Sequence, residues 1–374
     1  ITARLVDGTN GLERWSESFD RKLADVLAVQ AEIATSVADS LLSSLLQDGG
    51  WRAQRPGGTG NAKAFDAYIK GQALYQASAS TDGDRAALAA FDAALAADPG
   101  YAAAHAARAR CLTSIANMDP DPAGTASRRA QALASARKAI ALAPDMAEGH
   151  AALGFILMGQ LDLAGARDPY QRSFELGLGN APILASYAEF AANMGDFAPA
   201  ADAAARARRL DPLNPGVFRS AGLVAFGARD YAAARAPLES ALSLNPKAGV
   251  VHRLLGDMAL AQGDPASARA HYAQEPSTAS RLRGLAVADA RLNGRAAGEL
   301  HMQALIKAYG DAALFQQAEV LAQWGEGDKA MAALEQALAL RDSGLVLARN
   351  DPLLDPLRER PAFQALLRRI GLTA

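Results

Sequence analysis

The sequence predicts a mainly all-α protein, a superhelix of about eight helix–turn–helix units preceded by a small β-hairpin and one helix. Three observations predict this class. Small residues recur every 34 residues, turn signals recur at the same interval, and the first 60 residues differ in kind from those that follow. The recurring small residues are Gly154, Ala188, Gly222 and Gly256. Such a period is the length of a unit built from two antiparallel helices.

The beginning of the chain has strand and turn signals. Two strand-like runs, Ile1–Val6 and Leu12–Phe19, flank the turn residues Asp7–Gly11. Asp20 then precedes a helix with one apolar stripe, made of Val26, Val29, Ile33, Val37, Leu41 and Leu45. We expect residues 1–46 to form this hairpin and helix. Residues 47–63 are rich in glycine and proline, which is typical of a linker.

Residues 64–344 carry the repeats. Their expected starts are Ala64, Ala102, Ala147, Ala181, Pro215, Gly249, Ser277 and Asp311. Turns such as Gly195-Asp196 separate the two helices of a unit, because glycine tolerates a positive φ and aspartate caps the next helix. The second unit has a longer stretch, Ser114–Arg129, which we expect to be a solvated insertion. Residues 345–374 are expected to cap the array, with one apolar face made of Phe363, Leu366, Leu367 and Ile370.

These features resemble two known families. Residues 64–344 resemble tetratricopeptide repeats. The opening, ITARLVDGTNGLERWSESFDRKLADVLAVQAEIATSVADSL, resembles the end of a TolB-like domain. In bacterial multidomain regulators that domain precedes tetratricopeptide repeats and a tail of the form Asp-Pro-Leu-x-Asp-Pro-Leu-x-x-x-Pro-x-Phe. This chain has that tail at Asp351–Leu357, Pro361 and Phe363. The resemblance implies that the chain begins inside a larger sheet. It also implies that a winged-helix, adenylate-cyclase-type or kinase domain lies upstream.

Composition narrows the class of partner. The chain has 374 residues, 50% of them hydrophobic, and 38 Lys+Arg against 40 Asp+Glu. A net charge of -2 gives no global field that would recruit nucleic acid or an anionic membrane. No apolar run approaches the roughly 18 residues of a membrane span. We expect a cytoplasmic protein that does not bind nucleic acid directly, with a periplasmic location open if a signal or anchor lies upstream.

A search for catalytic motifs gives no candidate, so we expect no enzyme activity, no cofactor and no metal. Walker, HExxH, GxSxG and CxxC patterns are absent. Three histidines (His105, His150 and His252) occupy the same point of the first helix in their units, which favours a packing role. Cys111 is the single cysteine and has no basic neighbour placed to activate it. Asp119–Pro122 lacks the spaced ligands of a calcium loop.

Binding in the concave groove is the better hypothesis. The tetratricopeptide resemblance implies that ligands contact the second, fifth, ninth, twelfth and thirteenth positions of each unit. The fifth position gives Arg219, Arg253 and Arg281 in successive units. Other predicted groove residues are Phe155, Met158, Leu223, Phe226, Leu260, Leu285, Glu189, Asp257 and Glu319. An arginine series beside apolar pockets suits an acidic peptide or a terminal carboxylate. The alternative is that these arginines are solvated, or paired with Asp257 and Glu189.

Three functions remain in order of support. The first is a protein-interaction and regulatory module of a larger bacterial signalling or transcription regulator. The second is a free-standing scaffold for cell-envelope or complex assembly. The third is an enzyme built on helical repeats, for which the sequence offers no converging titratable groups. The edge strands of the hairpin also suggest self-association into a homodimer.

Overall fold

The computed structural model describes residues 2–6, 13–18, 36, 57–77, 81–118 and 122–372. Strands β1 (Thr2–Val6) and β2 (Glu13–Ser18) pair antiparallel, with Thr2 opposite Ser18 and Leu5 opposite Trp15. The predicted turn, the helix after Asp20 and most of the linker lie outside the described residues. The hairpin-plus-helix unit therefore stays a prediction.

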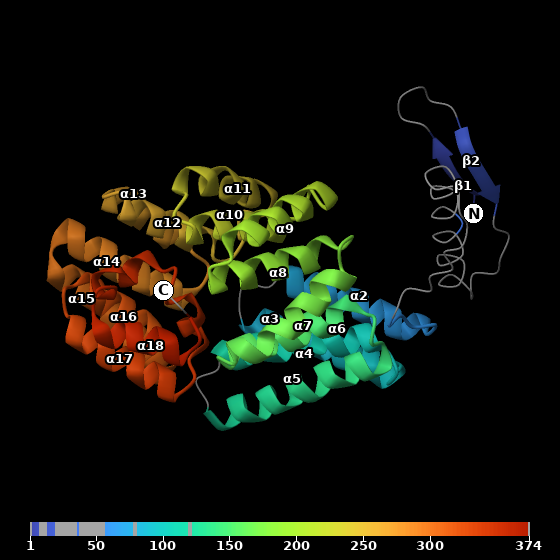
Figure 1. The fold of residues 1–374 in the computed structure, drawn as a ribbon, viewed down its shortest axis with the longest axis horizontal. Helices are drawn as coiled ribbons and strands as arrows, with labels where there is room; N and C mark the ends of the chain where they lie inside the picture. The colour runs from blue at the N-terminus through green and yellow to red at the C-terminus, as the bar shows by residue number, and fades with distance from the viewer. Residues whose placement is uncertain are drawn as a thin grey trace.

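From residue 62 onward the described chain is a succession of eight helix pairs (Figure 1). The first helices of the pairs are α2 (Ala62–Ala77), α4 (Ala102–Met118), α6 (Ala147–Gly159), α8 (Ala181–Met194), α10 (Pro215–Gly227), α12 (Val251–Ala261), α14 (Thr278–Asn293) and α16 (Leu314–Gln323). The second helices are α3 (Thr81–Ala97), α5 (Pro122–Leu142), α7 (Leu163–Leu176), α9 (Phe197–Leu210), α11 (Tyr231–Leu244), α13 (Pro265–Gln274), α15 (Arg295–Tyr309) and α17 (Gly327–Ala339). A short 3₁₀ turn, η2 (Gly310–Ala313), precedes α16. The prediction of about eight units is confirmed, and no strand occurs in the described residues of 57–372.

Small residues allow the two helices of a unit to approach closely. A Cβ atom added at Gly222 would lie 2.5 Å from Leu238, and one added at Gly256 would lie 2.5 Å from the Tyr272 ring. Gly154 stands in the same relation to Tyr170. Distances this short cannot accommodate a side chain, so the 34-residue pattern of small residues marks the helix–helix contacts.

The turns between the two helices of a unit use a residue with positive φ, and this residue is not always a glycine. Gly195 and Gly263 have φ values of 87° and 79°, as expected for Gly-Asp turns. Leu161 and Arg229 occupy the equivalent place in their units and also have positive φ, 60° and 64°. Each precedes an aspartate that caps the second helix: Asp162 accepts from the Gly165 amide at 2.9 Å and Asp230 from the Ala233 amide at 2.9 Å. The repeat therefore imposes the left-handed conformation even where the sequence has no glycine.

The expected insertion in the second unit is largely helical. Ser114–Met118 continue α4, and Pro122–Arg129 belong to α5, the longest described helix at 21 residues. Only residues 119–121 fall between them, outside the described residues. The alanines and arginines on both sides propagate helix well, and Pro122 fits the first position of α5 because its missing amide hydrogen has no partner there.

The C-terminal segment, residues 343–372, does more than cap the last repeat. It consists of η3 (Ser343–Leu347), η4 (Pro352–Leu357) and α18 (Pro361–Arg369). The predicted apolar face of α18 is buried: Phe363, Leu366, Leu367 and Ile370 are at most 4% exposed.

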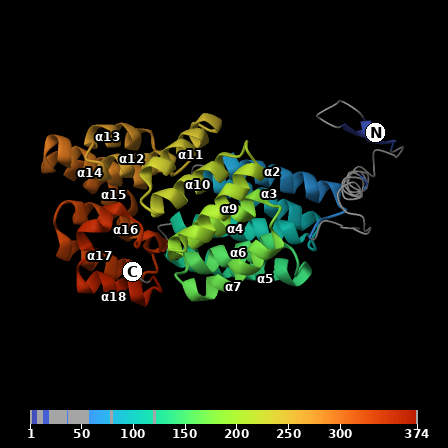
Figure 2. The ribbon, with the colours of Figure 1, turned by 45° about the horizontal axis from the view of Figure 1, so that its top comes forward.

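The same segment joins distant repeats. One hydrophobic core combines Leu163 and Tyr170 of α7 and Phe190 of α8 with residues of α16, α17, η3, η4 and α18. Figures 1 and 2 show these C-terminal helices, in red, beside the green helices that include α7. The array therefore closes on itself through the C-terminal segment.

Candidate functional site

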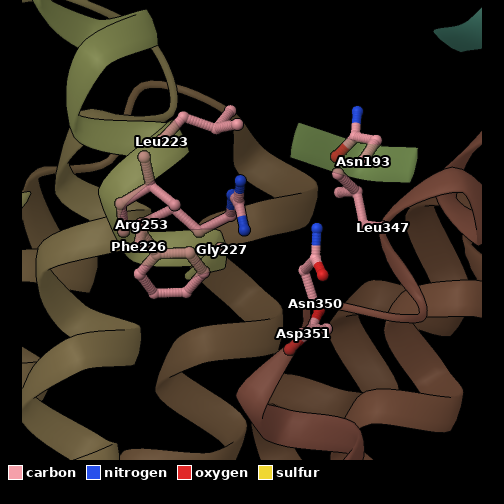
Figure 3. A pocket seen from close by; sticks show the side chains of 9 residues that line it. Asn193, Leu223, Phe226, Gly227, Arg253, Leu347, Asn350 and Asp351 are labelled. Atoms are coloured by element: carbon pink, nitrogen blue, oxygen red, sulfur yellow. The ribbon is translucent and has the colours of Figure 1, made fainter. Parts of the chain in front are cut away.

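The first helices of units four to six, α8, α10 and α12, face the C-terminal segment. A pocket between them is lined by Asn193, Leu223, Phe226, Gly227, Arg253 and Leu254 from these helices, and by Leu347, Asn350 and Asp351 from the segment (Figure 3). Its volume of about 20 Å³ admits little more than one water molecule. This part of the predicted groove is therefore already filled by the chain itself.

Two of the three predicted groove arginines form ion pairs within the repeats. Arg219 lies 3.3 Å from Glu189, and Arg253 lies 3.2 Å from Asp257. These are the pairs that the alternative reading of the sequence offered. Arg281 does not extend the series, since its guanidinium donates to the carbonyl oxygen of Glu275 at 2.6 Å. That contact closes the turn before its own helix.

The predicted apolar groove residues have different surroundings. Leu223 and Phe226 line the small pocket, while Met158 packs against the core that contains the C-terminal segment. Leu260 is buried in the core around Tyr272, and Leu285 packs against it. Phe155 lies beside an arginine that was not among the predicted groove residues. The guanidinium carbon of Arg110 is 5.7 Å from the centre of the Phe155 ring.

Asp257 is the centre of a buried charge cluster. Its carboxylate accepts from Arg283 at 2.6 Å, from the Tyr272 hydroxyl at 2.6 Å and from Arg253 at 3.2 Å. Arg283 is 1% exposed and Asp257 is 0% exposed. Sequence reasoning missed Arg283 and Tyr272, because Arg283 lies outside the groove positions considered and Tyr272 belongs to a second helix, α13. The two glycines that face the Tyr272 ring, Gly256 and Gly284, were the available signal.

Glu319 on α16 extends this cluster to the C-terminal segment. Burial raises the pKa of the Glu319 carboxyl well above its usual value, Arg283 opposes that rise, and the nearby Asp351 adds to it. Arg283 lies between Asp257 and Glu319, with 3.6 Å between its Nε atom and Glu319 Oε1.

The remaining titratable candidates have structural surroundings. His105 and His150 donate to the carbonyl oxygens of Pro99 and Pro144 at 3.0 and 2.8 Å. His252 faces His271 instead, with 3.4 Å between their Nδ1 atoms. Cys111 is buried, and burial raises the pKa of its thiol to about 12. Within the described residues, no three His, Cys, Asp or Glu side chains are grouped to hold a metal. In the same ranges, no helix has the length and apolar character needed to cross a bilayer.

The first-helix face of units four to six is covered by the C-terminal segment, and we call it the closed part. The first-helix face of units one to three differs from it. The Tyr75 hydroxyl on α2 lies 2.7 Å from Ser114 Oγ on α4. One turn before Ser114 is Arg110, which approaches the Phe155 ring of α6. Tyr75, Arg110, Ser114 and Phe155 are all half-buried. They form a continuous surface across three neighbouring first helices, which we call the open face.

Comparison with known proteins shows the fold but no family. No family model matches the chain. A stretch of 168 residues is 32% identical to "Putative adenylate cyclase 3" of Rhizobium meliloti (strain 1021), spanning 44% of this chain and 28% of that protein.

Solved structures of similar fold have low sequence identity. A chain of the APC/C hetero-tetramer Cut9–Hcn1 matches 91% of this chain over 60% of its own length. The TM-score is 0.56 and the sequence identity is 17%. A chain of the human IFIT1 dimer with m7Gppp-AAAA matches 83% of this chain over 78% of its own length. The TM-score is 0.55 and the sequence identity is 16%. These matches support a tetratricopeptide-like helical repeat fold.

Proposed function

We propose that this chain is a non-catalytic protein-interaction module that binds a linear segment of a partner on its first-helix face. One observation carries the proposal: the closed part of that face already holds residues 343–357, a stretch of the chain that is not a repeat. A surface that accommodates a linear segment of its own chain has the features needed to accommodate one from another protein.

The contacts of that segment are those of linear-motif recognition. Leu353, Leu354 and Leu357 are buried against the repeats, at 2% exposure or less. The backbone is held by the Gln323 amide, which donates to the Leu353 carbonyl oxygen at 2.7 Å. At the rim, Arg229 pairs with Asp355 at 2.7 Å. Apolar anchors, backbone bonds and a charged rim together provide affinity and register.

A regulatory role in a larger bacterial signalling or transcription protein is part of this proposal. It is supported by the resemblance of residues 1–46 to a TolB-like domain and by the match to a protein named as an adenylate cyclase. Because the match spans 28% of that protein, the repeat region would lie beside an effector domain rather than contain it. In this arrangement, 47–63 is the linker, 64–344 the interaction array and 345–374 the closing segment.

Self-association through the strands belongs to the same proposal. Within the described residues, β1 and β2 form a sheet of two strands, so each strand has one edge without a strand partner. Such edges pair readily with other chains. Light scattering on the chain with and without residues 1–60 tests this point, and equal monomeric masses would contradict it.

The binding proposal is tested by selecting peptides from a random dodecapeptide library on the immobilised full chain. Peptides that bind the first-helix face should lose binding to Phe155→Glu. They should keep it with Leu300→Glu, because Leu300 is 68% exposed on the second helix α15. A library that yields no binder to the wild-type chain would contradict peptide binding. Binders that tolerate Phe155→Glu would contradict the assigned face.

A further inference from the structure

Arg110 is exceptional among the arginines of the first helices. The described first helices contain seven arginines, and six of them have hydrogen-bond or ion-pair partners: Arg108, Arg219, Arg253, Arg281, Arg283 and Arg291. For Arg110, the described residues provide neither a carboxylate nor a hydrogen-bond acceptor. Its Nε atom is buried without a partner.

The side chains around Arg110 include an aromatic ring and two tyrosine hydroxyls, and the charge of Asp84 also acts on one of these hydroxyls, that of Tyr75. Its guanidinium lies over the Phe155 ring, and its charge acts on the Tyr75 and Tyr170 hydroxyls. Glu189, the acidic residue of the next first helix, is occupied by Arg219 and by the Ser220 hydroxyl. Arg110 as a whole is half-buried, so the exposed part of its side chain can donate to an incoming acceptor, a hydrogen bond that the described residues do not supply.

We propose that Arg110 binds a carboxylate of a partner's linear segment, with an apolar side chain of that segment resting on Phe155. This inference rests on the proposed function and names its site and ligand class. A guanidinium binds a carboxylate through two parallel hydrogen bonds, which fixes the register of the segment. The aromatic wall limits hydration of the pair and so strengthens it.

The closed part of the first-helix face gives the same chemistry in a covalently attached form. There Arg229 holds Asp355, and the neighbouring Leu354 and Leu357 are buried. An acidic residue beside leucines is thus the kind of segment that this array already binds. Arg110 offers the corresponding charge on the open face, where the described residues place no such segment.

The first experiment compares selections on three full-length chains: wild type, Arg110→Met and Arg219→Met. Arg219 is the matched control because its charge is already paired within the same face. Wild type and Arg219→Met should enrich peptides with one Asp or Glu at a fixed distance from an apolar residue, and Arg110→Met should not. Libraries with free and with amidated carboxyl termini separate a side-chain carboxylate from a terminal one.

The second experiment measures affinity by fluorescence anisotropy with the best wild-type peptide and its Asp→Asn or Glu→Gln analogue. Losing the charged pair should weaken binding roughly 10- to 100-fold in wild type. The analogue should lose nothing further in Arg110→Met, because the interaction is already absent. Circular dichroism establishes that each variant is folded, and Arg110→Lys should retain part of the preference for the acidic peptide.

Three outcomes are distinct. Acidic selection that depends on Arg110 supports the inference. Peptides that bind wild type and Arg110→Met equally overturn the Arg110 site while leaving peptide binding intact. No peptide binding by the wild-type chain overturns the proposed function together with this inference.

Discussion

Gly222 and Gly256 each lie opposite a bulky side chain on the second helix of their own unit. Replacing either by leucine should destabilise the array by about 1–3 kcal/mol or more, since there is no room beside Leu238 or Tyr272. The matched control is Gly179→Leu, because a Cβ atom at Gly179 meets nothing within 4 Å. Thermal unfolding should show a lowered midpoint for the first two variants only. Unchanged midpoints for both variants would show that these glycines do not lie at close helix–helix contacts.

Glu319 should make stability depend on pH. Its pKa in the folded chain is raised above the ordinary carboxyl value of about 4.3, so the folded state binds a proton more tightly than the unfolded state. The free energy of unfolding should therefore fall as pH rises from the ordinary carboxyl pKa through the raised one.

Glu319→Gln tests this dependence because the amide stays neutral at every pH and has nearly the same size as the carboxyl group. The variant should lose the Glu319 share of the pH slope and be the more stable chain at high pH. The control, Glu239→Gln, changes an exposed glutamate paired with Arg235 and should leave the slope unchanged. Identical pH dependences of urea unfolding for wild type and Glu319→Gln would show that Glu319 does not bind a proton more tightly in the folded chain.

Sequence reasoning at the residue scale identified the close contacts but not the buried charges. Gly154, Gly222 and Gly256 were predictable because the repeat constrains them within one unit. The cluster of Asp257, Arg283, Glu319 and Asp351 was not, because its members come from three units and the C-terminal segment. Leu161 and Arg229 were missed for another reason: nothing in their side chains signals a positive φ.

At the scale of elements, η4 and its partner helices should open as a unit. Leu354 is 0% exposed, so Leu354→Asp places an unpaired charge in the core and should detach the C-terminal segment. Hydrogen exchange should then rise in residues 343–372 and at the carboxyl ends of α8 and α10, while α2 and α3 keep their protection. Leu340→Asp is the control because Leu340 is 53% exposed. Protection of α8 and α10 that is unchanged in Leu354→Asp would contradict their coverage by the segment.

The helices themselves followed from the sequence with one misreading. Four of the eight expected unit starts, Ala102, Ala147, Ala181 and Pro215, are the first residues of helices. The turn signals of Asp119–Pro122 suggested a long insertion, yet helix propensity on both sides outweighed them and lengthened α4 and α5. Local preferences therefore fixed the helix order well and the length of one connection poorly.

At the scale of the whole molecule, closure should change how the array unfolds. An open repeat array has only nearest-neighbour contacts, so its ends can unfold separately. Here Asn350 donates to the Ala192 carbonyl oxygen across 158 positions, and one core joins α7 and α8 to α16–α18. Calorimetry of the wild-type chain should show one dominant transition, which Leu354→Asp should split or broaden. Separate transitions of equal size in the wild type would show that the two parts unfold independently.

Closure was also the feature least accessible to sequence reasoning. The tail pattern at Asp351–Leu357 was recognised and assigned to the end of the array. Asn350, just before this pattern, donates to Ala192, and Asp355 within it pairs with Arg229. Ala192 and Arg229 lie in units whose own pattern is complete without these contacts. Contacts between residues so far apart in the sequence do not produce a periodic pattern. The sequence therefore predicts the repeats but not the packing of the C-terminal segment against units four and five.

The return of the C-terminal segment also has a mechanical consequence. An open superhelix is elastic: it can lengthen gradually, and it can widen to fit partners of different diameter. In this chain the contacts of Asn350, Asp355 and the buried leucines connect repeats that are distant in the sequence. A force that pulls units four and eight apart therefore acts on these contacts first. The molecule should resist stretching until these contacts break and should then yield abruptly. Until that point its span is fixed, and a partner must fit the width that the closed array presents.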